Sequence, residues 1–224
     1  MNKTNTTIYV IRHGQSEFNA TLDLDSIDMD KEDTPEAPLT TLGKEQVASL
    51  AQELKNIHFA AIFSSDLVRA KETAEAILME RKIAVQTTKV IRERDVVRPA
   101  IKLGYKSIDE IEIWLKKELK TLDEKGKMNF SFSLELETPN EGATRLLTFI
   151  REVSVAYAGQ TVAVVCHSNI MRCLLTHLGY AKFDELPRKS TQNAAYFVLE
   201  SDGVDFFVKE THGIQKIQGE ARGI

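Results

Sequence analysis

The chain has 224 residues, of which 42% are apolar, so it is long enough to bury a hydrophobic core in one large domain or two small ones. Its net charge is −4 with 28% charged residues, and this balance argues against nucleic acid or an anionic membrane as the main partner. The apolar run before Arg12 is too short for a secretion signal or a membrane span, and we expect a cytoplasmic protein.

Strand-like and helical segments alternate along most of the chain. Apolar runs with β-branched residues predict four strands, at 6–11, 59–64, 84–91 and 161–166. Near the end, "AAYFVLESDGVDFFVKE" predicts two more strands around Asp202-Gly203. We therefore expect an α/β fold, a three-layer sandwich with a central mostly parallel sheet, helices on both faces, and a C-terminal antiparallel hairpin.

Capping residues mark the starts of four predicted helices. Thr40 or Thr41 precedes an apolar face at helical spacing, and Ser65 precedes another. The segments "SIDE" at 107–110 and "TPNE" at 138–141 fit the capping box, and the second adds Pro139 at the first helical position. The apolar faces contain Val47, Leu50, Ala51 and Leu54, then Ala70, Ala74 and Ile77, then Leu146, Leu147, Ile150 and Val153.

Three stretches are expected to be peripheral. Residues 21–38 are acidic and lack a sustained period, which favours a solvated loop, and 211–224 form a short polar tail. The segment 95–138 carries a charged, two-sided helix around Trp114 and fits an insertion that covers one end of the sheet. We thus expect a single domain over 1–210.

Two cysteines, Cys166 and Cys173, lie seven residues apart on a predicted strand and the following helix. This spacing does not indicate the disulfide framework of a secreted domain. We expect both to be reduced residues packed in the core.

Charged and polar side chains follow the ends of the predicted strands. Arg12 and His13 follow the first strand, Glu93 the third and His167 the last, and Arg69 lies near the start of the helix after the second. The carboxyl ends of strands in an open α/β sheet face the ligand crevice, so these five side chains can converge in one pocket. A helix dipole disfavours a cation at the position of Arg69, and a bound anion would explain it.

Taken singly, each of these residues has an ordinary structural explanation. Arg69 alone would be a surface cation, His167 a hydrogen-bonded core histidine, and Glu93 a surface carboxylate within the charged "RERD". The three histidines without such a context, to which we assign no function, are His58, His177 and His212. The argument therefore depends on the coincidence of positions.

The motif "IRHGQSEFN" resembles the signature of the histidine phosphatase superfamily, the phosphoglycerate mutase-like proteins, in which Arg-His-Gly follows the first strand. The similarity extends, in the family's order, to "PLTTLGKEQ", "SSDLVRAKETA", the acid after the third strand and "VVCHSNIMRCLL". Together these motifs span most of the chain.

The resemblance implies a role for each residue of the predicted pocket. His13 is the nucleophile that becomes phosphohistidine, and Glu93 is the candidate proton donor. The phosphoryl group is held by Arg12, Arg69 and His167, with Asn19 as a helper. Ser168 stands where many members have glycine, and its hydroxyl is a further candidate donor to phosphate.

Physical chemistry supports this assignment. Guanidinium forks and an imidazole donor can stabilise the negative charge that spreads over a phosphoryl group in transfer, without a metal or other cofactor. Nearby arginines favour the neutral, nucleophilic form of His13, and glycine at position 14 permits close backbone approach beside it. We expect a metal-independent phosphatase acting on phosphomonoesters, with a small phosphorylated substrate or a phosphoprotein as its partner.

Other functions remain open at this point. A mutase of the same fold would need a tyrosine- and glycine-rich substrate loop, and "RDVVRPAIKLGYKS" after Glu93 lacks it. A non-catalytic phospho-ligand-binding module has no need of the intact pocket, and a metallohydrolase has no H-E-x-x-H pattern here. The basic residues Arg92, Arg94, Arg98, Lys102 and Lys106 indicate either a solvated charged face, which we favour, or recognition of a second anionic group. The sequence indicates neither the physiological substrate nor the oligomeric state.

Overall fold

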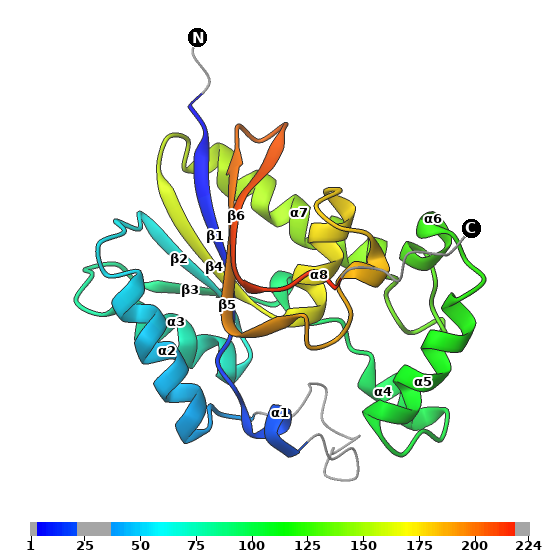
Figure 1. Ribbon diagram of the computed structural model, residues 1–224. Coiled ribbons are helices and arrows are strands. Elements are labelled where there is room, and N and C mark those ends of the chain that lie inside the picture. The colour runs from blue at the N-terminus through cyan, green and yellow to red at the C-terminus, as the bar shows by residue number, and fades with distance from the viewer. Residues whose placement is uncertain (1–3, 22–36, 218–224) are drawn as a thin grey trace.

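The computed structural model describes residues 4–21 and 37–217. Six strands form one sheet in the order β3-β2-β4-β1-β5-β6, with helices on both faces (Figure 1). Neighbours among the first four strands are parallel, whereas β5 runs antiparallel to β1 and to β6. The strands are β1 (Thr6–Arg12), β2 (Ala61–Ser65), β3 (Val85–Thr88), β4 (Thr161–Cys166), β5 (Thr191–Ser201) and β6 (Phe206–Ile214). The predicted three-layer α/β fold with its C-terminal hairpin is confirmed.

The two faces of the sheet bury two separate cores. Val162 and Val164 of β4 pack with α7 (Pro139–Ala156) and α8 (Ser168–His177), while Ala163 and Val165 pack with the helices of the other face. This alternation follows from the period of two along a strand whose two faces are both covered. The helices of the second face are α2 (Thr41–Glu53) and α3 (Val68–Leu78).

Capping residues begin most of the predicted helices as expected. Thr40 accepts a hydrogen bond from Gly43 N at the start of α2, and Thr138 forms a complete capping box with Glu141 at the start of α7. Ser107 accepts from the backbone at the start of α5 (Ile108–Leu119). The predicted cap at Ser65 is wrong, because that residue ends β2 and α3 begins three residues later, after Leu67.

Two predicted boundaries differ from the structure. The strand expected at 84–91 ends at Thr88, whose side chain accepts a hydrogen bond from Val90 N and begins the 3-10 helix η1 (Lys89–Ile91). The polar tail expected from residue 211 begins later, since Thr211 and His212 pair with β5 inside the sheet. Most of the predicted acidic loop, and residues 218–224 of the tail, lie outside the described residues.

The segment 95–138, here called the covering segment, lies to one side of the sheet (Figure 1). It contains α4 (Val97–Lys102), α5 and α6 (Glu124–Met128). Ile111 and its neighbours form a small apolar cluster of their own, which Phe18 of α1 (Glu17–Thr21) joins. That this segment is an insertion into a single domain stays a prediction.

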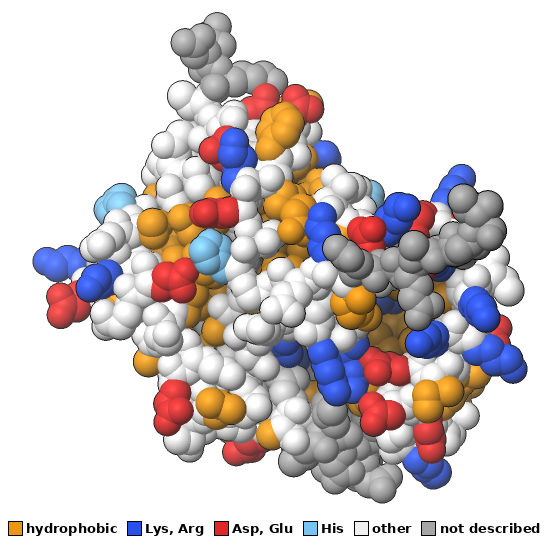
Figure 2. Space-filling model, in the orientation of Figure 1, with side chains coloured by type: hydrophobic (Ala, Val, Ile, Leu, Met, Phe, Trp, Pro, Cys, Tyr) orange, Lys and Arg blue, Asp and Glu red, His pale blue; other side chains and the backbone are white. Residues whose placement is uncertain are grey.

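Ion pairs connect the covering segment to the main body. Arg188 precedes β5. Its Nη2 lies 3.1 Å from Asp109 Oδ1, and its Nε lies 2.6 Å from Glu112 Oε1; both acids belong to α5. Lys127 pairs with Asp184 in the 3-10 helix η2 (Phe183–Glu185). The space-filling view shows basic and acidic side chains side by side between the sheet and these helices (Figure 2).

The remaining core features concern cysteines and helix hydropathy. Cys166 and Cys173 are free thiols and both are buried, as predicted. Among residues 4–21 and 37–217, no helix combines the length and the apolar character that crossing a bilayer requires.

Candidate active site

His13 lies directly after β1, and two contacts define its tautomer. Its Nδ1 is 2.6 Å from the carbonyl oxygen of Gly14, a pure acceptor, so the ring proton is on Nδ1. Arg69 donates from Nε to Nε2 of the same ring at 3.2 Å. The Nε2 atom therefore carries the lone pair, which is the arrangement that a nucleophilic imidazole needs.

The second histidine of the prediction lies beside the first. The ring centroids of His13 and His167 are 5.1 Å apart, and the side chains are 3% and 0% exposed. Parallel pairing of β1 with β4 brings them together, because Arg12 is level with Cys166 and each histidine follows its strand by one residue. Side chains that are about 150 residues apart in sequence thus share one strand-end pocket.

Several buried polar atoms in this pocket have no protein partner. Among the described residues, nothing hydrogen-bonds to Arg12 Nε or to either ring nitrogen of His167. Arg12 is otherwise held through Nη1, which donates to the carbonyl of Thr191. Buried polar atoms without partners are costly, so their concentration beside a nucleophile indicates a site for an anionic ligand.

Burial, together with the positive charges in the pocket, keeps the imidazoles neutral. Burial, and then the positive charges of Arg69 and Arg12, lower the pKa of His13 well below its ordinary value of 6.5. Burial and the same arginines, with His13 itself, lower the pKa of His167 in the same direction. Burial lowers the pKa of Arg12 and of Arg69 to about 10, so both guanidiniums keep their charge at neutral pH.

Strand β5 supports the backbone of the nucleophile through an irregular stretch. The pairing of β5 with β6 shifts register between Thr191 and Tyr196, and Ala194 there adopts a φ of 58°. Within this bulge, Ala194 N donates to His13 O at 3.2 Å and Asn193 Nδ2 donates to the same oxygen at 3.4 Å. A left-handed alanine is a strained conformation, and here it accompanies two hydrogen bonds to the carbonyl oxygen of His13.

Glycine 14 allows the loop after His13 to lie against α2 and α3. A Cβ atom at this position would be 2.6 Å from Val47 Cγ2 and 2.7 Å from Gly43 O, so the close approach predicted for this glycine is confirmed. Gly14 N donates to Thr73 Oγ1 at 3.1 Å, and that hydroxyl donates to Arg69 O at 2.8 Å. Thr73 therefore links the nucleophile loop to the helix that carries Arg69.

Glu93 also reaches the strand ends, but its carboxylate has backbone partners. Its Oε2 accepts from Asn169 N at 2.8 Å, and its Oε1 accepts from Ile170 N at 2.9 Å and from Arg94 N at 3.0 Å. Glu93 thus caps the N-terminus of α8. The N-cap residue itself, His167, forms no side-chain capping hydrogen bond. Its role as proton donor stays a prediction.

The two predicted phosphate helpers lie at the edge of the pocket. Asn19 Oδ1 accepts from Ser16 Oγ at 3.1 Å and from Asn193 Nδ2 at 3.5 Å, which leaves its amide nitrogen with no acceptor among the described residues. Ser168 is the first residue of α8 and follows His167 directly. Both positions are compatible with a bound phosphate, and both roles stay predictions.

Sequence reasoning missed three residues near this pocket. Thr73 lies one helical turn after Arg69, and Asn193 lies in the bulge of β5. Arg172 of α8 lowers the pKa of Arg12 through its positive charge, and it was part of the quoted motif after His167 without being singled out. The spacing of four from Arg69 was the available signal for Thr73, whereas a bulge carries no signal in the strand pattern.

Some charged and histidine residues do not join the pocket. Arg94 is 8% exposed and bound to other protein groups, so the solvated-face interpretation is wrong for this residue. His177 is exposed and contacts Asn140, and His212 stacks on Tyr196. In the part of the chain that the structure describes, no cluster of three or more His, Cys, Asp or Glu is arranged to hold a metal ion.

Curated relatives share part of the sequence. Fructose-2,6-bisphosphatase TIGAR of Xenopus tropicalis is 35% identical over 85 residues, which are 38% of this chain and 28% of that protein. Probable phosphoglycerate mutase GpmB of Proteus mirabilis is 32% identical over 89 residues, which are 40% of this chain and 38% of that protein. The matched stretch therefore spans less than two thirds of the length of either relative.

Solved structures share the fold over nearly the whole chain. Phosphoglycerate mutase from Bacillus anthracis str. Sterne has a TM-score of 0.69 at 22% identity and covers 94% of both chains. Phosphoserine phosphatase from Entamoeba histolytica, in complex with 3-phosphoglyceric acid, has a TM-score of 0.72 at 19% identity and covers 94% of this chain and 98% of that chain. At these identities the likeness shows the fold.

The family model described as "Histidine phosphatase superfamily (branch 1)" matches residues 8–212. This range includes every predicted pocket residue and extends from β1 into β6. The chain therefore belongs to the histidine phosphatase superfamily, as the motif resemblance predicted.

Proposed function

We propose that this protein is a metal-independent phosphatase that hydrolyses phosphomonoesters through a phosphohistidine on His13. One observation carries the proposal: the unprotonated Nε2 of a buried imidazole lies among two guanidiniums and a second imidazole, and Arg12 Nε and the ring nitrogens of His167 lack protein partners. A tetrahedral oxyanion would satisfy these donors and offset the charge of the arginines.

The reaction proceeds in two transfers. In the first, Nε2 of His13 attacks phosphorus, the bond between phosphorus and the ester oxygen breaks, and Glu93 gives a proton to the leaving alkoxide. In the second, the Glu93 carboxylate takes a proton from water, the water oxygen attacks phosphorus, and the phosphorus–nitrogen bond breaks. The products are an alcohol and inorganic phosphate, and His13 is restored.

Arg12, Arg69 and His167 stabilise the charge on the phosphoryl oxygens during both transfers. Their positions are fixed before substrate binds, because Arg12 is tied to β5 and Arg69 to the nucleophile itself. Preorganised donors of this kind avoid the reorganisation that water would need, and this is the largest usual source of catalysis in phosphoryl transfer.

The substrate is proposed to be a small phosphorylated molecule. The matched relatives and neighbours are described as acting on, or bound to, sugar bisphosphates, phosphoglycerate and phosphoserine, which all carry a phosphomonoester. A mutase that returns the phosphoryl group to a second hydroxyl would use the same first transfer. Water as the final acceptor is favoured because the segment after Glu93 lacks the mutase-type loop.

Turnover of an aryl phosphate in the presence of EDTA tests the proposal. We expect the wild-type protein to release phosphate from p-nitrophenyl phosphate at the same rate with and without chelator. Loss of activity with EDTA that a divalent cation restores would contradict the metal-free mechanism. Isomerisation of a phosphoglycerate without release of inorganic phosphate would favour the mutase.

A further inference from the structure

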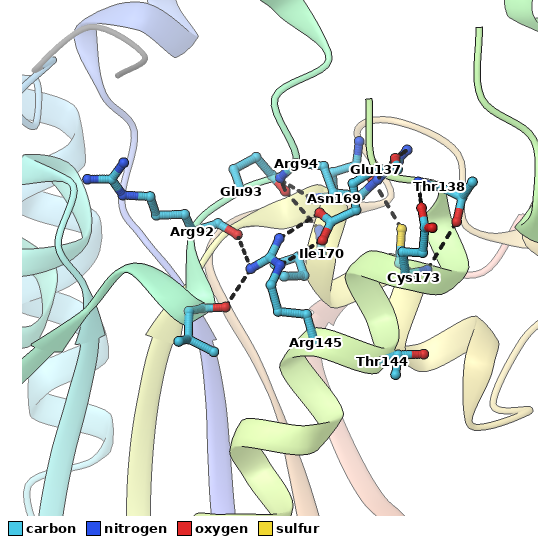
Figure 3. Close-up of polar contacts among 12 residues, drawn as sticks. Arg92, Glu93, Arg94, Glu137, Thr138, Thr144, Arg145, Asn169, Ile170 and Cys173 are labelled. Carbon is cyan, nitrogen blue, oxygen red and sulfur yellow. Dashed lines mark hydrogen bonds and ion pairs between the residues drawn. The ribbon is translucent and has the colours of Figure 1, made fainter. Parts of the chain in front are cut away.

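Three consecutive residues after η1 are fastened to two places, the segment just before α3 and the start of α8. Arg92 binds Asp66, just before α3, through two contacts of 2.6 Å. Glu93 caps α8 as described above, and Arg94 donates from Nη1 to Asn169 Oδ1 at 3.3 Å. Figure 3 shows the guanidinium of Arg92 pointing away from the group formed by Glu93, Arg94 and Asn169. Glu93, the proton-donor candidate, is therefore the middle residue of a tripeptide in which all three side chains are bound to other parts of the protein.

Arg145 of α7 binds the backbone of this tripeptide. Its Nη1 donates to the carbonyl oxygen of Val90 and, at 3.1 Å, to that of Arg92 (Figure 3). Val90 lies within η1, and Arg92 is its C-cap residue. The carbonyls at a helix end are the natural partners of a cation. Since Arg92 O belongs to the peptide bond that leads into Glu93, Arg145 fixes the backbone from which the carboxylate projects.

Glu137 fixes Arg145 in turn. Arg145 Nε and Nη2 each donate to one carboxylate oxygen of Glu137 at 2.7 Å, a two-pronged contact with definite geometry. The backbone oxygen of Glu137 accepts from Arg94, with a contact of 3.0 Å from Nε. Glu137 is near the end of the covering segment and Arg94 directly precedes its start, so the same bonds also join its two ends.

We propose that Arg145 is a positioning residue for phosphoryl transfer, acting through Glu93, a role that rests on the proposed function above. Arg145 makes no hydrogen bond to the nucleophile or to the phosphate-binding groups in the described structure, and it holds Glu93 through the carbonyl of Arg92. Its loss lets the carboxyl shift from the leaving oxygen. A shift of about 1 Å in a catalytic group can cost about a hundredfold in rate.

The test compares leaving groups that do and do not need protonation. In Arg145→Met, we expect kcat/KM for an alkyl phosphate to fall between about tenfold and about a hundredfold, while kcat/KM for 2,4-dinitrophenyl phosphate changes by less than about threefold, because kcat/KM reports the first transfer alone. KM for the alkyl phosphate should stay within about threefold, because its first transfer limits turnover. A variant that is only less stable would slow both substrates equally, and that result would overturn the inference.

A double-mutant comparison separates action through Glu93 from an independent effect. In a Glu93→Gln background, Arg145→Met should change kcat for the alkyl phosphate by less than about twofold, because the group that it positions is already disabled. Multiplication of the two single effects would overturn the inference. Arg145→Lys keeps a cation and should restore part of the activity.

A matched control lies on the same helix. Arg151 of α7 donates to Gly203 O at 3.1 Å, away from the strand-end pocket, and Arg151→Met should retain both activities. If Arg145→Met does not fold, Glu137→Gln carries the test, since it weakens the hold on Arg145 and should slow the alkyl phosphate selectively. A wild-type protein inert towards both esters would remove the proposed function and this inference with it, whereas equal slowing of an active enzyme removes the inference alone.

Discussion

The strand-end pocket and the covering segment hold their polar and charged side chains in different ways. In the pocket, Arg69 and the two histidines are at most 5% exposed, and main-chain groups of the sheet fix their loops. In the covering segment, the pair Lys102 and Glu135 has side chains that are 56% and 61% exposed. Buried charges make strong, short-range interactions, while exposed ion pairs are screened and contribute little.

This difference separates two tasks in the molecule. A preorganised pocket gains from being unable to relax, because phosphoryl transfer depends on donors that are already in place. A segment with exposed pairs and a small apolar cluster can change its side chains at little cost in stability. We therefore expect substitutions in the pocket to abolish chemistry and those in the covering segment to adjust substrate affinity.

The largest effect is expected from His13→Ala. Removal of the attacking nitrogen should abolish turnover of an aryl phosphate and trapping of an acid-labile phosphoenzyme, as measured by phosphate release and by acid quench of labelled enzyme. His58→Ala is the matched control, because that histidine is exposed and lies at the opposite ends of the strands. Turnover of the His13 variant at the wild-type rate would show that the nucleophile is another group.

The second-largest loss of activity is expected from Arg69→Lys. Lysine keeps the charge but not the planar fork that donates to His13 and to phosphoryl oxygens, so kcat/KM should fall about a hundredfold. Lys71→Met on the same helix serves as the control and should retain activity. Full activity of Arg69→Lys would mean that charge alone matters at this position.

The next effect in size is the decrease in the free energy of unfolding at acid pH. The folded protein holds His13 and His167 neutral below pH 6.5, whereas the unfolded chain takes up protons there. The free energy of unfolding should therefore have its maximum contribution from these histidines above pH 6.5. Below that pH it should fall by about 1.4 kcal/mol per pH unit for each histidine. Urea denaturation across this range measures the slope, and His167→Asn should reduce it. An unchanged slope would show that these histidines do not set it.

The smallest effect is expected at the base of the covering segment. Arg188→Gln removes the ion pairs to Asp109 and Glu112, which are 78% and 41% exposed, so unfolding should change by no more than about 1 kcal/mol. The KM of small esters should change by less than about threefold, with kcat unaltered. Thermal melting and steady-state kinetics at low and high salt check this, and a tenfold fall in kcat would place Arg188 in the chemical step.

The sequence predicted the sheet and the members of the pocket because both depend on short-range patterns. Apolar runs that end in Arg12, His13 and His167 indicate strands and their carboxyl ends, and parallel pairing then brings those ends together. The capping box at Thr138 was equally local. That these side chains meet is observed, while their chemical roles stay predictions.

The parts that the sequence did not predict depend on tertiary contacts. The bulge that presents Ala194 N to His13 has no signature in the alternation of β5. The surroundings of Glu93 depend on the start of α8, about 75 residues later in the chain, and Arg94 is buried only because Glu137 and Asn169 accept its hydrogen bonds. Single-sequence patterns give a charge but not its partner.

The bulge in β5 has a practical consequence for anyone who shortens this protein. A fragment that ended after α8 would contain every side chain assigned to the chemistry. It would still lose Ala194 N and the Asn193 side chain, which hold the carbonyl of His13, and Thr191 O, which holds the guanidinium of Arg12. The terminal hairpin therefore supports the strand-end pocket, and we expect that a minimal version of the protein has to retain it.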